Sequence, residues 1–187
     1  YAYGIDNDGE SASFTMSDGS IDMTAACGPG CNAFGLDIAG VNITGGYIKA
    51  RAKDGYVSYG IWIANGSGTA SISDTILDIT SNNSEVNYGL SSNGPVSLSG
   101  ATVTIDTEST ESAYGIRTNQ GGLTLTESSV DITTKAPDNP WGLWAESMDT
   151  TDSTVDVKVD ATTKGGYGAY IEDAFTMTGG SLSVDLT

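Results

Sequence analysis

Carboxylates are the side chains with the greatest chemical potential in this sequence. Asp and Glu number 24 against 7 Lys and Arg, which gives a formal net charge of −17, and there is no His. The lack of His removes the commonest general base and the commonest transition-metal ligand. Binding to nucleic acid or to an anionic membrane requires clustered Lys and Arg, so the charge argues against both partners and favours cations.

Four aspartates share one outward position of a ten-residue block that recurs along the chain. They are candidates for a cation ladder: Asp22, Asp78, Asp131 and Asp156. In stacked repeats Asp131 and Asp156 would lie about 5 Å apart, where two like charges repel each other. A bound Ca²⁺, which prefers oxygen ligands, would relieve that repulsion. The alternative is a solvated acidic face with no required cofactor, because Lys49 and Thr104 interrupt the column.

Aromatic side chains form the second candidate site. Trp62, Trp144 and Tyr170 occupy outward positions, as does Arg117, each shortly after an aromatic-Gly-aliphatic triplet. Exposed aromatic rings on a flat sheet can stack on sugar rings or on a partner protein. Trp144 and Tyr170 fall in neighbouring repeats and would form a platform, unless loops fold over them.

Two further features concern covalent chemistry. Cys27 and Cys31 enclose Gly-Pro-Gly, which can bend the chain into a small disulfide loop; an interchain bridge or two free thiols are the alternatives. Two thiols without His make a metal site unfavourable, and a disulfide would indicate an oxidising, extracellular setting. Three Asn-x-Ser/Thr triplets are candidate glycosylation sites. They begin at Asn42, Asn65 and Asn82.

Catalysis has little support in the sequence, and we expect that the chain is not an enzyme. Glycoside hydrolysis needs two carboxylates at a defined separation, and the repeat offers many carboxylates without singling out a pair. The adjacent Asp-Asp pair that some glycosidases use does not occur here either. The two arginines, Arg51 and Arg117, do not sit among paired acids in the sequence.

The element that must position all these residues is an internal repeat. An aromatic-Gly-aliphatic triplet occurs seven times, and its glycines are 31, 25, 29, 26, 27 and 26 residues apart. Its glycines are Gly4, Gly35, Gly60, Gly89, Gly115, Gly142 and Gly168. Each triplet precedes a ten-residue block, such as VNITGGYIKA from Val41, in which positions 1, 3, 8 and 10 are apolar with few exceptions.

The block predicts two short strands on either side of a tight turn. The triplet predicts a third strand, with its aromatic and aliphatic residues inward and its glycine outward. Three strands in about 27 residues make one coil, and stacked coils bury what a single coil cannot. We therefore predict an all-β, right-handed parallel β-helix of seven coils, forming one domain over residues 1–187. Connecting loops are expected at residues 24–33, 80–87, 106–113, 133–140 and 158–166.

One internal ladder should run the length of this solenoid. Its predicted members are Ile21, Ile48, Leu77, Val103, Val130, Val155 and Leu182. The repeat runs to both ends of the sequence without a recognisable cap, which would leave backbone edges and apolar ladders open to another chain. Membrane insertion is not expected, because no apolar run approaches the roughly 20 residues that span a bilayer.

The blocks FTMTGGSLSV and VNITGGYIKA, with Tyr-Gly-Ile between blocks, resemble the repeats of secreted and cell-surface prokaryotic β-helix proteins. The resemblance spans the whole chain and is specific for architecture. One branch of these proteins is described as calcium-containing carbohydrate-binding domains, and it tends to have Asp-Gly-Ile where this chain has an aromatic residue before glycine. Self-assembling surface-layer and sheath proteins are similar in general character: acidic, rich in Ser, Thr and Gly, and β-rich.

Together these features lead to two expectations of function. The first is an extracellular or cell-surface structural protein that associates with copies of itself, through stacked solenoid ends and lateral contacts, into a surface layer, sheath or filament. The alternative is a calcium-assisted, carbohydrate-binding β-helix module of a cell-surface adhesin, whose partner would be a polysaccharide.

Overall fold

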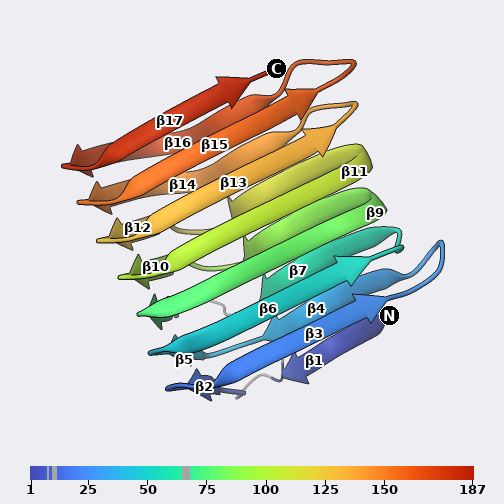
Figure 1. Ribbon diagram of the computed structural model, residues 1–187, viewed down its shortest axis with the longest axis horizontal. Helices are drawn as coiled ribbons and strands as arrows, with labels where there is room; N and C mark the ends of the chain where they lie inside the picture. Colours follow the sequence, from blue (N-terminus) through green and yellow to red (C-terminus); the bar gives the residue numbers. More distant parts are fainter. Residues whose placement is uncertain (8, 10–11, 65–67) are drawn as a thin grey trace.

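The computed structural model describes residues 1–7, 9, 12–64 and 68–187. These residues form 17 strands and no helix, and all the strands belong to one hydrogen-bonded sheet. Strands one coil apart pair in parallel, as in the pairings of β1 with β4 and of β15 with β17. The predicted all-β solenoid of about seven turns is confirmed (Figure 1).

The strands follow the repeat along the chain. The first two coils contain β1 (Ala2–Asn7), β2 (Phe14–Met16), β3 (Ser20–Ala26), β4 (Asn32–Ile38), β5 (Val41–Ile43) and β6 (Gly46–Lys53). The middle coils contain β7 (Val57–Ile63), β8 (Ala70–Ser73), β9 (Thr75–Ser92), β10 (Val96–Ser99), β11 (Thr102–Thr118), β12 (Leu123–Thr126) and β13 (Ser129–Ala136). The last two coils contain β14 (Trp141–Thr151), β15 (Thr154–Ala161), β16 (Tyr167–Thr178) and β17 (Ser181–Leu186).

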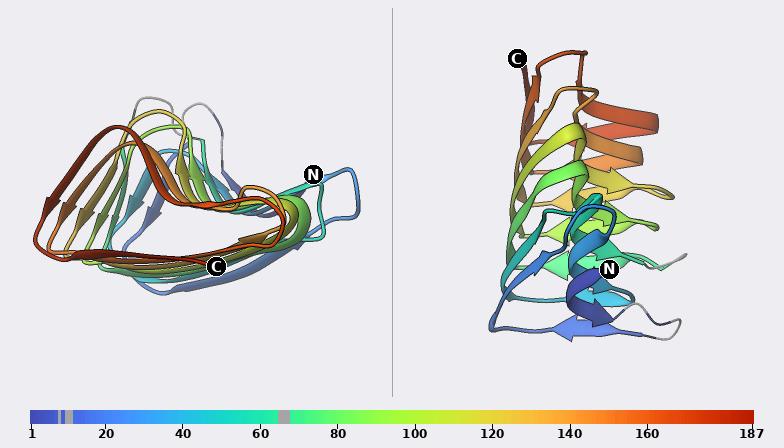
Figure 2. Two further views of the ribbon diagram at one scale, coloured as in Figure 1. Left: turned by 90° about the horizontal axis from the view of Figure 1, so that it is seen from above. Right: turned by 90° about the vertical axis from the view of Figure 1, so that its right-hand side faces the viewer.

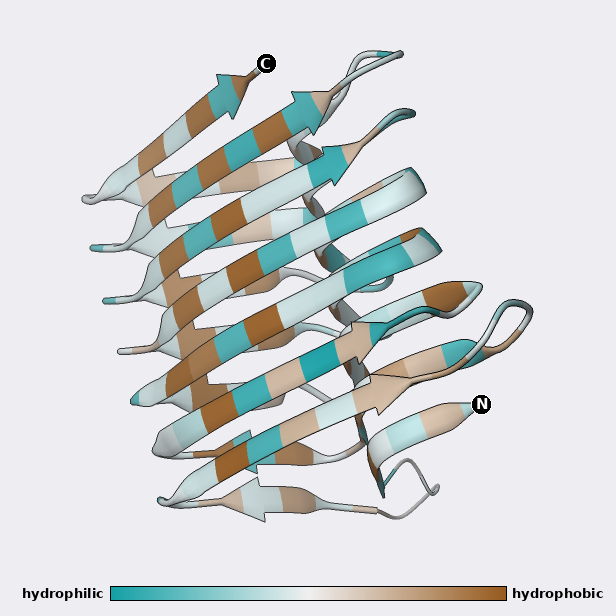
Figure 3. Ribbon diagram, turned by 45° about the vertical axis from the view of Figure 1, so that its right-hand side comes forward, coloured by the Kyte–Doolittle hydropathy of each residue, from teal (hydrophilic) through white to brown (hydrophobic). Residues whose placement is uncertain are grey.

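Equivalent residues of successive coils lie directly beside one another, so the coils superpose when viewed along the stack (Figure 2). The predicted inner ladder is present, with every neighbouring pair from Ile21 to Leu182 in register. Its central members Ile48 and Leu77 are fully buried. Apolar bands of β9, β11, β13 and β15 line up accordingly (Figure 3). Because β-branched and aliphatic residues alternate with polar ones, each strand offers one face to this core.

The triplets correct one expectation from the sequence. The aliphatic residue faces the core, but the aromatic residue faces outward and the glycine inward. A Cβ on Gly60 would overlap Cγ2 of the core residue Ile79. Tyr59 and Ile61 pair with their equivalents in the next coil, whereas Gly60 has no partner in the register. The strand therefore bends at the glycine, and simple alternation, which assumes a straight strand, gives the wrong side for the aromatic residue.

Residues 80–87 and 106–113 are also not the loops expected from their polar composition. They lie within β9 and β11, which pass from one coil to the next without a break. In β9, buried polar side chains contribute to this: Ser81 Oγ lies 3.0 Å from the carbonyl oxygen of Ser58 and 2.9 Å from Asn87 Oδ1. Two register shifts in β11 turn the chain at the corner. A polar segment can remain a strand where the interior supplies hydrogen-bond acceptors.

Candidate binding surface

Seven aromatic rings form a continuous column on the outer face of the solenoid. The successive ring centroids are 5.1, 4.9, 4.7, 4.7, 6.2 and 4.1 Å apart, and the planes are within 19° of parallel. The members are Tyr3, Phe34, Tyr59, Tyr88, Tyr114, Trp141 and Tyr167. Burial within the stack, with a contribution from Tyr88, raises the pKa of Tyr59 to about 12. The spacing follows the strand spacing of about 4.8 Å, so the coil repeat itself sets the stacking.

A second column, three residues further along each strand, lies against the first. Trp144 and Tyr170 are register neighbours there, with ring centroids 6.1 Å apart in an edge-to-face arrangement, and both contact Trp141. Trp144 Nε1 donates a hydrogen bond to Glu172 Oε1 at 2.8 Å. We call Trp141, Trp144, Tyr167 and Tyr170 the aromatic platform. Tyr167 and Tyr170 are 46% and 40% exposed, so these two rings are open to solvent.

The structure thus brings together two of the three platform residues expected from the sequence. Trp62 lies three coils before Trp144, and its ring contacts Tyr59 edge-on at 5.0 Å. In the column between them are Ser91, which is buried, and Arg117. Trp62 is therefore part of the aromatic face but not of the aromatic platform.

Arg117 joins the two columns through its guanidinium group. Its Cζ lies 4.5 Å from the ring centroid of Trp144, 5.5 Å from that of Tyr114 and 5.6 Å from that of Tyr88. Nη1 donates a hydrogen bond to Tyr88 Oη at 3.0 Å. The sequence placed Arg117 on this face but gave no sign of its partners, because those partners come from three different coils. Stacking of a guanidinium on aromatic faces is a favourable cation–π arrangement.

The acidic column divides into paired and unpaired parts. Asp22 accepts a hydrogen bond from Arg51 at 2.6 Å, and Asp78 pairs with Lys49 at 2.9 Å and accepts a hydrogen bond from Tyr47 at 3.1 Å. Partial burial alone would raise the pKa of Asp78, but the bonds from Lys49 and Tyr47 hold it below its usual value. At Asp22 and Asp78, the positive charge that a bound cation was expected to provide therefore comes from the neighbouring Arg51 and Lys49.

Asp131 and Asp156 are the two aspartates of the acidic column that lie next to each other in neighbouring coils. They are exposed register neighbours, as expected from the sequence. Among the described residues there is no group of three or more Cys, Asp and Glu side chains placed to hold a metal ion. Two neighbouring carboxylates alone give Ca²⁺ fewer than the six to eight oxygens that it prefers, so water would have to complete its coordination.

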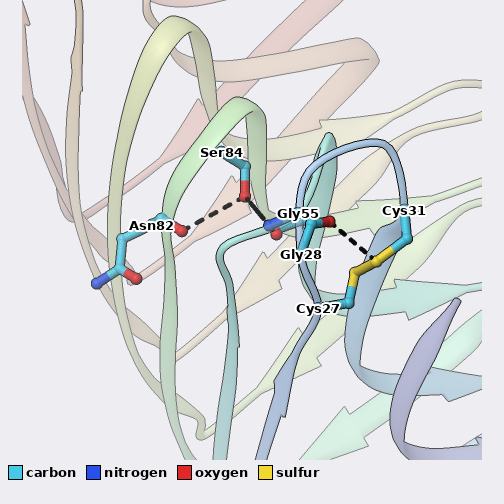
Figure 4. Close-up of a disulfide and its surroundings, with 7 residues drawn as sticks. Cys27, Gly28, Cys31, Gly55, Asn82 and Ser84 are labelled. Carbon is cyan, nitrogen blue, oxygen red and sulfur yellow. Dashed lines mark hydrogen bonds between the residues drawn. A yellow bond between two sulfur atoms is a disulfide. The ribbon is translucent and has the colours of Figure 1, made fainter.

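Cys27 and Cys31 form the expected disulfide within the connection from β3 to β4 (Figure 4). Cys31 Sγ lies 3.1 Å from the carbonyl oxygen of Gly28, which is a contact rather than a hydrogen bond because a disulfide sulfur carries no proton. The loop is held to the next coil by Tyr56 N–H, which donates to the Cys31 carbonyl at 2.6 Å. Disulfides persist in oxidising environments, which weakly favours such a setting for this chain.

The three glycosylation triplets lie in different surroundings. Asn42 is exposed in β5. Asn82 is half-buried in β9, and the serine of its triplet, Ser84, is buried, where its hydroxyl accepts a hydrogen bond from Gly55 N–H at 3.0 Å (Figure 4). Asn65 lies outside the described residues. Of the two described asparagines, Asn42 is the more accessible to a glycosylating enzyme.

The outermost coil, β16 and β17, carries the largest group of exposed apolar side chains. Phe175 is 46% exposed, Met177 39%, Val184 44% and Leu186 57%. Their register partners one coil earlier are at most 3% exposed: Met148, Thr150, Val157 and Val159. The same positions of the repeat are thus buried where a further coil covers them and open where none does.

Comparison of the chain with protein-family models, with curated proteins and with solved structures found no match. The described residues include no helix of the length and apolarity needed to cross a membrane. The candidate surfaces are therefore three, each defined by this chain alone: the aromatic face with Arg117, the acidic column, and the open face of the outermost coil.

Proposed function

We propose that this chain is an extracellular structural protein that associates with copies of itself through stacked solenoid ends and lateral contacts. The observation that carries the proposal is the open face of the outermost coil, where four large apolar side chains stand 39–57% exposed at positions that are buried in the coil beneath. Burial of apolar surface is the main favourable term in association. A coil from a second copy could cover these side chains by stacking in the same register that the coils have within the chain.

The first and last coils resemble each other in residue type. Phe-Thr-Met opens the block of both, at residues 14–16 and 175–177, and Phe occupies this position in no other coil. Stacked head to tail, Phe175 would meet Phe14 and Tyr167 would meet Tyr3. The aromatic column would then continue across the junction at the spacing it has within the chain.

The backbone supplies the second contribution. β17 pairs with β15 along one edge, and no described strand pairs with its other edge. β1 pairs with β4 in the same way at the opposite end. An unpaired strand edge is a template for another strand, and a head-to-tail contact does not close on itself. The expected product is an open filament, which lateral contacts would organise into a layer or sheath.

A pair of charge variants tests this proposal. Leu186→Asp places a carboxylate on the open face, and Thr176→Asp places one on β16 at an outward position beside Phe175. We expect the unmodified chain to associate as its concentration rises, Leu186→Asp to remain monomeric and Thr176→Asp to behave like the parent. Light scattering with negative-stain microscopy gives the mass and shape. Monomers of the parent chain at all concentrations and calcium levels would contradict the proposal.

Carbohydrate binding is a second candidate, favoured by the finding that the aromatic column faces outward. The aromatic platform offers two solvent-exposed rings, Tyr167 and Tyr170, beside Trp141 and Trp144. Aromatic faces bind sugar rings through stacking and apolar contact. Calcium assistance would involve Asp131 and Asp156, on the separate acidic column.

A glycan array measured with calcium and with a chelator tests the second candidate. We expect Trp144→Ala to reduce binding at least about tenfold, since truncation of a central aromatic anchor typically costs more than 1 kcal/mol. Tyr56→Ala removes another exposed aromatic side chain, 49% accessible and with no described ring contact, and should bind like the parent. Absence of any glycan ligand, or equal binding by Trp144→Ala, would count against carbohydrate binding.

A further inference from the structure

The two arginines of this chain have opposite surroundings. Arg51 forms an ion pair with Asp22 at 2.6 Å and lies 3.3 Å from Thr24 Oγ1. Arg117 forms no ion pair with any described residue, although the chain contains 24 Asp and Glu. Five of the seven bases are paired with carboxylates among the described residues, and the other unpaired base, Lys158, is an exposed lysine. Arg117 is thus a cation held apart from the acids of its own chain.

The position of Arg117 is fixed by its aromatic neighbours. Three rings from three coils surround the guanidinium within 5.6 Å, and Tyr88 Oη accepts a hydrogen bond from Nη1. Nε is buried and has no hydrogen-bond acceptor among the described residues. The residue as a whole is half-buried rather than enclosed. A pre-positioned, partly desolvated guanidinium without a counter-ion is a site for a planar anion.

The surroundings of Arg117 indicate what carries that anion. Trp144, whose ring lies under the guanidinium, also contacts Tyr170 and so links Arg117 to the aromatic platform. A ligand that contacts both would combine a ring face with a planar anion such as a carboxylate. Sugar rings stack on aromatic faces, and a carboxylate can accept two parallel hydrogen bonds from a guanidinium. A hexuronic acid has both features in one residue.

We propose that the aromatic face binds polysaccharides that contain hexuronic acids, with the uronate carboxylate on Arg117 and sugar rings on the aromatic platform. This proposal rests on the carbohydrate-binding candidate above and names its ligand class. The net charge of −17 opposes approach of a polyanion only over short range, because the Debye length at physiological ionic strength is about 8 Å. Arg117 would supply the local attraction.

The first test needs no variant. Polygalacturonate and alginate are each compared with their neutral esters, which keep the ring and linkage but remove the charge, by calorimetry at physiological salt. We expect the unesterified polymers to bind at least about tenfold more tightly, the scale of a hydrogen bond to a charged group. Equal binding of acid and ester would overturn the uronate proposal and leave carbohydrate binding standing. If neither acid binds, the uronate proposal also fails, and the glycan array decides the broader candidate.

The second test assigns the preference to Arg117. Arg117→Gln should abolish the preference for the acid, Arg117→Lys should keep part of it because charge remains without the planar fork, and Arg51→Gln should retain it fully. Circular dichroism checks that each variant is folded. If Arg117→Gln does not fold, Arg117→Lys is the variant that tests the proposal. An acid preference that survives in a folded Arg117→Gln or is undiminished in Arg117→Lys would overturn the proposal.

Discussion

Leu77 and Leu182 occupy the same position of the repeat and the same ladder, yet their surroundings differ. Leu77 pairs with Ile48 on one side and with Val103 on the other, and it is fully buried. Leu182 pairs, among the described residues, with Val155 alone, and it is half-buried. The difference shows that position in the repeat sets which side chains face inward, whereas burial depends on the coils above and below.

The inner coils and the outermost coil therefore differ in how their ladders are covered. In the inner coils, ladders such as Val130 to Val155 are closed on both sides and supply stability. In the outermost coil, the ladder of Val130 and Val155 ends in half-buried Leu182, and the neighbouring ladders of Val157 and Val159 end in exposed Val184 and Leu186. If a coil from another copy stacked on β17, the exposed side chains of the outermost coil would be covered as those of the inner coils are.

Truncation of the two leucines should give the largest measurable difference. Leu77→Ala leaves a cavity between two coils and should lower the free energy of unfolding by about 2–5 kcal/mol. Leu182→Ala should cost less than about 2 kcal/mol, because its side chain is covered from one side only. Urea unfolding followed by circular dichroism measures both. Equal losses would show that the outermost coil is as well covered as the inner ones.

The glycines extend the comparison to the bend in each triplet. A Cβ on Gly115 would overlap Cγ2 of Ile132 and the Gly142 carbonyl of the next coil, so neither neighbour can move freely. For a Cβ on Gly168, the three nearest atoms all belong to the Val184 side chain. We expect Gly115→Ala to cost about 1–3 kcal/mol through overpacking.

Gly168→Ala should cost clearly less, because the Val184 side chain can shift toward the open face. Thermal melts of the two variants compare them directly. A loss for Gly168→Ala that matches or exceeds the loss for Gly115→Ala would contradict the idea that the outermost coil has room to relax.

Tyr59 tests the closed stacking of the inner coils through pH. Its pKa is raised to about 12, chiefly by burial, above the ordinary value of 10.0. The folded state disfavours the tyrosinate, so the contribution of Tyr59 to stability is complete below pH 10 and is lost as the pH rises toward 12. Ultraviolet titration of tyrosinate should show a late-titrating tyrosine that is absent in Tyr59→Phe. A titration curve that Tyr59→Phe leaves unchanged in shape would contradict a buried stack.

Substitutions in the acidic column should have the smallest effects on stability, and the effects at Asp78 and Asp131 should have opposite signs. Asp78→Asn removes an ion pair with Lys49 and should destabilise by up to about 1 kcal/mol, an effect that weakens with salt and disappears at acid pH as Asp78 is protonated. Asp131→Asn removes a like-charge neighbour of Asp156 and should leave stability unchanged or slightly raised. Denaturant midpoints at low and high salt measure both. A calcium-dependent loss in Asp131→Asn would instead indicate a bound cation.

The sequence predicted the coils, their register and the inner ladder because these follow from an apolar period that needs no long-range information. It failed at Gly60, where a bend reverses the side of Tyr59, and at Ser81, where buried acceptors keep a polar segment in a strand. Both failures depend on contacts with other strands. The surroundings of Arg117 were likewise beyond prediction, because Tyr88 and Trp144 belong to neighbouring coils and approach it only after the coils have stacked.

Hydrogen–deuterium exchange at increasing protein concentration tests end-to-end association most directly. The amides of β17 that point away from β15 have no described partner, so they should exchange rapidly in the monomer. The association proposed here predicts that these amides become protected as concentration rises, while β9 within the inner coils is protected throughout. Protection of β17 should be lost in Leu186→Asp. Exchange of β17 that stays rapid and independent of concentration in the parent chain would contradict the proposal.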